Sequence, residues 1–184
     1  MDYTHFIRGW GMDTTKSRAW LRALQALLAV PLLAAWMTGC EPQRAEMLAE
    51  DVSTEEDVRR MFGEPKTVTV GADGTRTLEY PRQPEGYANY IMVIGTNGKL
   101  SSLRQLLNPD NFAKVTPGLD REAVRRILGP HARERRFELK KETLVEWRFR
   151  DGQEAKIFGV TFGPDGLVTG TAITADQREL EPNR

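Results

Sequence analysis

Two stretches of this 184-residue chain repeat one another: TEEDVRRMFGEP from Thr54 and DREAVRRILGPH from Asp120. Each carries apolar residues at the i, i+3, i+4 spacing of an amphipathic helix. These residues are Val58, Met61 and Phe62 in the first stretch and Val124, Ile127 and Leu128 in the second. Each stretch starts at a residue suited to cap a helix and ends at a glycine, Gly63 or Gly129, with a proline just beyond. The repeat therefore predicts two short helices of one kind within a duplicated fold.

Residues that favour strands follow each predicted helix in the same order. KTVTV and TRTLEY flank a GADG turn in the first copy, and RRFELKK and TLVEWRF flank a shorter connection in the second. Next, YIMVIGTNGKLSSL aligns with FGVTFGPDGLVTGT, so that an Asn-Gly turn corresponds to an Asp-Gly turn between apolar strands. We therefore expect an α+β fold of two tandem repeats, each a short helical element followed by an antiparallel sheet of about four strands.

The composition excludes several classes of protein. The 26 basic residues equal the 26 acidic ones, so no overall charge attracts nucleic acid. One cysteine cannot close an internal disulfide, and Cys40 with His5 and His131 cannot supply four ligands to a zinc ion. We expect a globular chain with no nucleic-acid partner, no metal and no cofactor.

The first 39 residues are predicted to be a targeting segment. MDTTKSRAW, from Met12, carries positive charge and is followed by the uncharged run ALQALLAVPLLAAW. This order is typical of a signal peptide, and the run is shorter than the roughly 20 residues of a comfortable transmembrane helix. Met1 and Met12 both remain possible start sites.

Residues Met37, Thr38, Gly39 and Cys40 resemble the lipobox of bacterial lipoproteins. The resemblance implies cleavage between Gly39 and Cys40, a diacylglyceryl group on the Cys40 sulfur and an acyl group on the new amino terminus. One acyl chain anchors a protein only marginally, whereas several anchor it stably. The resemblance also implies the outer membrane, with the protein facing the periplasm, because Glu41 and not Asp follows the cysteine. The alternative is a free cysteine at the end of an N-terminal membrane helix.

These patterns divide the chain into five segments. They are the signal peptide 1–39, the lipidated terminus and spacer 40–52, the first repeat 53–110, the second repeat 111–174 and the polar tail 175–184. The connection LLNPDNFAKVTPG is expected to hold one more helical turn, with Pro109 following the cap residue Asn108.

The stretch FAKVTPGLDREAVRRILGP resembles the entry motif of the BamE (SmpA/OmlA) family of small outer-membrane lipoproteins. The residues that carry the resemblance are Lys114, Val115, Gly118, Val124, Leu128, Gly129 and Pro130. LVEWRF and FGPDGLV are similar to the family's aromatic strand and final hairpin. The resemblance implies a role in outer-membrane protein assembly, with the barrel-assembly complex, or in envelope integrity. The doubled unit is also similar to β-lactamase-inhibitor-like proteins, which implies the alternative of a module that blocks a periplasmic or secreted enzyme.

We expect a binding protein rather than an enzyme. A catalytic nucleophile needs an activating base, and His131, the histidine left after signal removal, directly follows a helix-ending proline. The candidate binding residues are Arg133, Arg135 and Arg136 in ARERRFELKK, and Tyr87 and Tyr90 in PRQPEGYANY. The basic cluster would suit acidic lipid headgroups or an acidic protein surface. The alternative for the arginines is an ordinary strand face exposed to solvent. The alternative for the tyrosines is an ordinary connecting loop that buries them.

Overall fold

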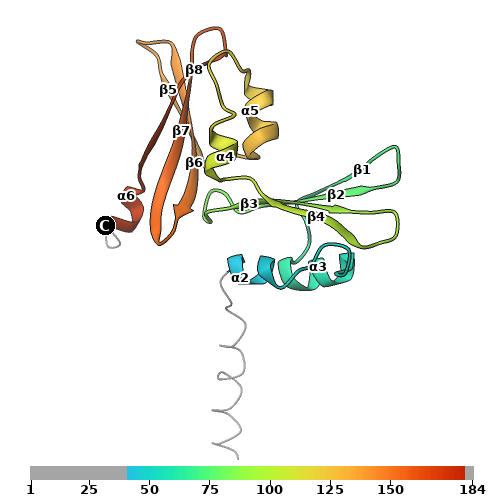
Figure 1. The fold of residues 1–184 in the computed structure, drawn as a ribbon. Helices are drawn as coiled ribbons and strands as arrows, with labels where there is room; N and C mark the ends of the chain where they lie inside the picture. Colours follow the sequence, from blue (N-terminus) through green and yellow to red (C-terminus); the bar gives the residue numbers. More distant parts are fainter. Residues whose placement is uncertain (1–40, 181–184) are drawn as a thin grey trace, which may run out of the picture. The chain divides into compact units, whose positions relative to one another are not determined.

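The computed structural model describes residues 41–180 (Figure 1). The predicted signal peptide, lipobox and Cys40 lie outside the described residues, as do the last four residues of the tail. The described residues from Arg44 onward belong to one compact unit.

The first repeat forms a four-stranded antiparallel sheet in the order β1-β2-β3-β4. Its elements are α2 (Glu41–Glu46), α3 (Glu55–Phe62), β1 (Thr67–Val70), β2 (Arg76–Pro81), β3 (Asn89–Ile94) and β4 (Leu100–Gln105). Helix α2 falls within the predicted spacer, and Leu48, just after it, packs into the first core.

The second repeat forms an equivalent sheet in the order β5-β6-β7-β8. Its elements are α4 (Pro109–Phe112), α5 (Arg121–Leu128), β5 (Arg133–Phe137), β6 (Glu142–Asp151), β7 (Glu154–Phe162), β8 (Val168–Ala175) and the terminal α6 (Gln177–Leu180). Helix α4 is the extra turn expected after Asn108, whose side chain caps it. The predicted α+β fold of two tandem repeats is confirmed.

The two main helices begin and end as the sequence predicts. Thr54 caps α3 and Asp120 caps α5, each accepting a hydrogen bond from a backbone N–H in the first turn. Gly63 and Gly129 follow the helices with φ of 79° and 75°, a left-handed region that favours glycine. Each helix therefore stops at the same place in its repeat.

Backbone hydrogen bonds tie the start of each helix to the last strand of its own sheet. Leu100 N donates to Ser53 O over 2.8 Å, and Val168 N donates to Leu119 O over 2.8 Å. In return, Leu100 O accepts from Asp51 N and Val168 O accepts from Gly118 N. Asp51 and Gly118 both have positive φ, 62° and 91°. Each repeat thus closes on itself around a separate core.

Alternation along the strands gives each sheet a helix face and an outer face. The first core contains Val58, Phe62, Leu78, Tyr80, Tyr90, Met92, Ile94 and Leu100. The second contains Phe112, Val124, Leu128, Val145, Trp147, Phe149, Phe158, Val160 and Phe162. In each repeat the main helix covers one face of its sheet, so the residues between the core residues of β2, β3, β6 and β7 lie on the outer face (Figure 1).

Candidate binding site

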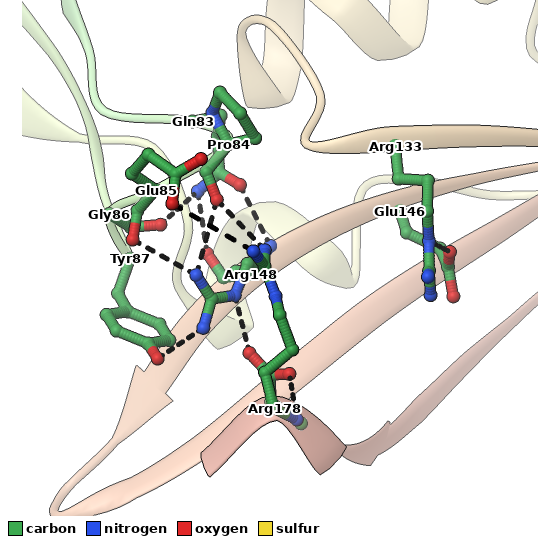
Figure 2. A network of polar contacts seen from close by, with 10 residues as sticks. Gln83, Pro84, Glu85, Gly86, Tyr87, Arg133, Glu146, Arg148 and Arg178 are labelled. Carbon is green, nitrogen blue, oxygen red and sulfur yellow. Dashed lines mark hydrogen bonds and ion pairs between the residues drawn. The ribbon is translucent and has the colours of Figure 1, made fainter. Parts of the chain in front are cut away.

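Arg148 on β6 lies at the centre of a buried polar network (Figure 2). Its Nε donates to Asp176 Oδ2 over 2.5 Å, and both side chains are less than a tenth exposed. Its Nη1 donates to Glu85 O over 3.0 Å, and its Nη2 donates to Tyr87 Oη over 2.5 Å. The guanidinium also lies over the Tyr87 ring, 4.3 Å from its centroid. A buried charge is tolerated when its polar hydrogens find partners, as they do here.

The loop between β2 and β3, residues 82–88, is fastened to the same residue through Gln83, and we call it the aromatic loop. The Gln83 side chain donates from Nε2 to Arg148 O over 2.8 Å and accepts at Oε1 from Arg148 N over 3.1 Å. Its amide therefore pairs with the backbone of β6 as a neighbouring strand would. These contacts join the aromatic loop of the first repeat to the sheet of the second.

The two tyrosines of the predicted surface have different places in the structure. Tyr87 is part-buried and engaged by Arg148, so its ring and hydroxyl serve contacts inside the molecule. Tyr90 is 4% exposed and packs at 5.3 Å, edge to face, on Phe62. It points into the core because it lies in β3 on the side of Met92 and Ile94. Tyr90 is therefore not available to a partner.

The predicted arginines divide between the two faces of the second sheet. Arg133 and Arg135 lie on the outer face, and Arg133 is directly opposite Glu146 in the register of β5 and β6. Glu146 accepts from Arg133 Nε over 2.8 Å and from Arg135 Nη2 over 3.0 Å. Its side chain is 7% exposed, whereas those of the two arginines are 56% and 47% exposed. Arg136 alternates with them and pairs with Glu134, which also contacts Arg121 of α5 on the helix face.

A hollow of about 900 Å³ opens on the outer face of the second sheet. It is lined by Arg133, Arg135, Glu146 and Arg148 of β5 and β6, by Ile157 and Thr174 of β7 and β8, by Pro84 and Glu85 of the aromatic loop, and by Asp176, Gln177 and Arg178 near α6. We call this concavity the arginine groove. Arg133 and Glu146 lie along its strands, away from the Arg148 network (Figure 2).

Sequence reasoning missed Glu146, Arg148, Asp176 and Arg178. For Glu146 and Arg148 the sequence does contain a signal, EWRF, in which the glutamate and the arginine alternate with two aromatic residues. Such alternation places both charges on the face opposite the core.

The described residues offer neither a metal-binding cluster nor a membrane-spanning helix. Residues 41–180 contain no group of three or more His, Cys, Asp or Glu side chains placed to hold a metal ion. None of their helices is long and apolar enough to span a membrane. His131 is exposed and lies edge to face with Trp147, 6.1 Å between ring centroids. The groove is the feature of these residues best suited to contact another molecule.

Comparison with solved structures finds nine similar chains, of which two are described here. YjgB, a DUF4309 family protein of Bacillus subtilis, is 22% identical with a TM-score of 0.32, over 73% of this chain and 86% of its own. A Streptococcus mutans protein described provisionally as a β-lactamase inhibitor protein is 10% identical with a TM-score of 0.30, over 72% of this chain and 93% of its own. Similarity this low identifies no function. No protein-family model matches the chain, and comparison with curated proteins finds no match.

Proposed function

We propose that this protein is a lipid-anchored scaffold of the bacterial envelope that binds another protein through the outer face of its second sheet. The observation that carries the proposal is the arginine groove, an open concavity whose walls are held by a buried ion-pair network. A concave surface with cations at its rim suits recognition of a partner rather than covalent chemistry.

The location follows from the lipobox resemblance of Met37 to Cys40. Lipidated Cys40 would hold the mature chain at the outer membrane on the periplasmic side. The BamE resemblance makes components of outer-membrane protein assembly the proposed partners. The inhibitor-like alternative would use the same sheet face against a periplasmic or secreted enzyme.

The partner is tested by site-specific photo-crosslinking in native membranes. A crosslinking residue replaces Thr174, which lines the groove, or Val70, which is exposed on β1 in the other repeat. We expect barrel-assembly components to be captured at position 174 and not at position 70. Capture of one secreted hydrolase would replace the assembly proposal by the inhibitor alternative. Equal capture at both positions would overturn the groove as the binding site.

The anchor is tested separately with Cys40→Ala. We expect the variant to lose labelling by radioactive fatty acid and to leave the membrane fraction, because the sulfur that accepts the glyceryl group is gone. Ser53→Ala, which keeps the lipobox intact, serves as the control. An alanine variant that is still labelled and still sediments with membranes would refute the role of Cys40.

A further inference from the structure

The arginine groove has a structural counterpart in the first repeat. Both sheets shift register at the same place, between Val93 and Ile94 and between Thr161 and Phe162. Counting back along the strands from this shift aligns Asn89 with Ile157. Their cross-strand partners then align as well, Pro81 with Arg148 and Glu79 with Glu146. The groove residues Glu146, Arg148 and Ile157 thus correspond to Glu79, Pro81 and Asn89.

In the first repeat this surface is occupied by the C-terminal end of helix α5. Asn89, 1% exposed, donates from Nδ2 to Leu128 O over 2.7 Å and to Pro130 O over 2.9 Å. The approach is close, since a Cβ on Gly129 would meet Asn89 Nδ2 at 3.0 Å. A space of only about 250 Å³ remains beside the helix end. The last carbonyls of a helix need such donors, because they have no partner within the helix.

In the second repeat the corresponding surface has no counterpart of α5 among the described residues. Pro84 and Glu85 and the start of the short helix α6 border it, and the space between them is about 900 Å³. The same duplicated unit therefore presents one filled and one open version of a single docking surface. By this correspondence the open version would accept the C-terminal turn of a helix. Its donors would be the arginines at the rim, because Ile157 stands where Asn89 donates and has no polar hydrogen.

The charged residues at the rim of the open surface indicate which kind of helix end it accepts. Glu79 and the α5 residues Arg125 and Arg126 all line the small space in the first repeat. In the second repeat Arg133 and Arg135 already engage Glu146, and both remain about half exposed at the rim. Arg178 is equally exposed and lies 3.9 Å from the exposed carboxylate of Glu85, so three exposed arginines face one exposed carboxylate. A helix end with carboxylates complements this rim, and the negative end of the helix dipole adds to the attraction.

A second copy of this chain fits the groove poorly. The equivalent helix it would offer is α3, which carries the basic pair Arg59 and Arg60. Its end is also already capped, since Phe62 O accepts from Arg82 Nη2 and Gly63 O accepts from Tyr80 Oη.

We propose that the arginine groove docks the C-terminal end of a partner protein's helix, and that this helix end carries carboxylates. The inference rests on the proposed function and names the chemistry of its partner. The contact would repeat, between two proteins, the packing of α5 on the first sheet.

The test uses the full-length lipoprotein in detergent micelles and two fluorescent alanine-based helical peptides. One peptide ends in three glutamates and the other in three lysines, with the sequences otherwise identical. We expect binding of the glutamate peptide alone, weakened by salt. Equal binding of both, or no binding of the glutamate peptide at millimolar concentration, would overturn the proposal.

Two groove variants and one matched control locate the contact. Arg133→Gln combined with Arg135→Gln should weaken glutamate-peptide binding about tenfold, from the loss of two exposed ion pairs. Thr174→Trp fills the groove, leaves the ion pairs in place and should abolish binding. It therefore tests the contact independently of the double variant, whose loss of both Glu146 partners can disturb folding. Arg136→Gln, on the same strand but the other face, should bind as the wild type does. Unchanged binding by Thr174→Trp would overturn the assignment.

Vesicles containing anionic phosphatidylglycerol separate a membrane contact from a protein contact. If Cys40→Ala protein binds these vesicles and Thr174→Trp removes that binding, the groove recognises lipid headgroups and the proposal fails.

The peptide result is also separable from the crosslinking result. Capture of an envelope protein at position 174 without preference for the glutamate peptide would leave the proposed function standing and remove only this inference.

Discussion

Arg148 ties together three segments that are far apart in the sequence. Its guanidinium reaches Glu85 and Tyr87 in the loop of the first repeat and Asp176 beyond the last strand of the second. Removing one partner from a buried ion pair leaves the other charge without compensation, whereas removing both costs much less. The stability of this contact therefore depends on the whole set of partners.

We predict that Arg148→Met lowers the free energy of unfolding by about 3–5 kcal/mol, because Asp176 stays buried and unpaired. Adding Asp176→Leu should recover part of the loss. Arg136→Met, which removes an exposed arginine, should cost at most about 1 kcal/mol. Urea unfolding followed by circular dichroism measures all three. Equal losses for Arg148→Met and Arg136→Met would contradict the buried network.

The helices α3 and α5 are copies that differ in how they are capped. Thr54 and Asp57 form a reciprocal pair, in which Asp57 N donates to Thr54 Oγ1 and Thr54 N donates to Asp57 Oδ2. Asp120 caps α5, but Ala123 stands where α3 has Asp57 and cannot return the bond. Hydrogen bonds from Thr54 hold the pKa of the Asp57 carboxyl below its usual value.

This pKa shift predicts a pH-dependent contribution from α3. A carboxyl whose pKa is lowered by folding adds stability above its unfolded-state pKa, and that stability is lost as the pH falls through the folded-state pKa. Asp57→Asn should therefore be less stable than the wild type at pH 7, with the difference shrinking below about pH 4. Glu56→Gln, in the same turn but outside the Thr54–Asp57 pair, is the matched control. Urea midpoints at both pH values test this; a constant difference for Asp57→Asn would refute it.

One hairpin turn occurs three times within residues 41–180. GADG, GTNG and GPDG each end in a glycine with positive φ, Gly74, Gly98 and Gly166. In each, the third residue's side chain accepts from the backbone N–H two positions on, as Asp165 does from Leu167. Such turns depend on neighbours in the sequence, which is why they were predictable.

The two cores of residues 44–180 are joined by polar contacts from the first repeat to the second. Asn89 holds the end of α5, Gln83 pairs with the backbone of β6, and Arg148 reaches back to the loop. Polar contacts between separate cores couple them only while every donor has its acceptor. Cooperative unfolding of the whole molecule should depend on these few groups.

We predict that the wild type unfolds in one calorimetric transition and that Gln83→Ala combined with Asn89→Ala separates it into two. The double variant removes contacts between the cores and leaves both cores intact. Gln153→Ala, an exposed amide, should leave a single transition. A single sharp transition in the double variant, shifted only in temperature, would mean that other contacts couple the repeats.

The sequence by itself determined the duplication, the capped ends of α3 and α5, the glycine turns and the α+β class. The caps, the turns and the helix and strand patterns depend on residues a few positions apart, and the duplication is visible because the same local pattern occurs twice. The lipobox prediction also rests on a local pattern, and it stays a prediction.

Only the tertiary structure decided which sheet face is filled and which is open. Asn89 meets Leu128 and Gln83 meets Arg148 across 39 and 65 positions of sequence, and no local pattern records such a pairing. The arginines of ARERRFELKK were visible as a basic cluster, but their division between two faces depends on the register with β6. The end of α5 covers the outer face of the first sheet, whereas the corresponding face of the second sheet lines the arginine groove.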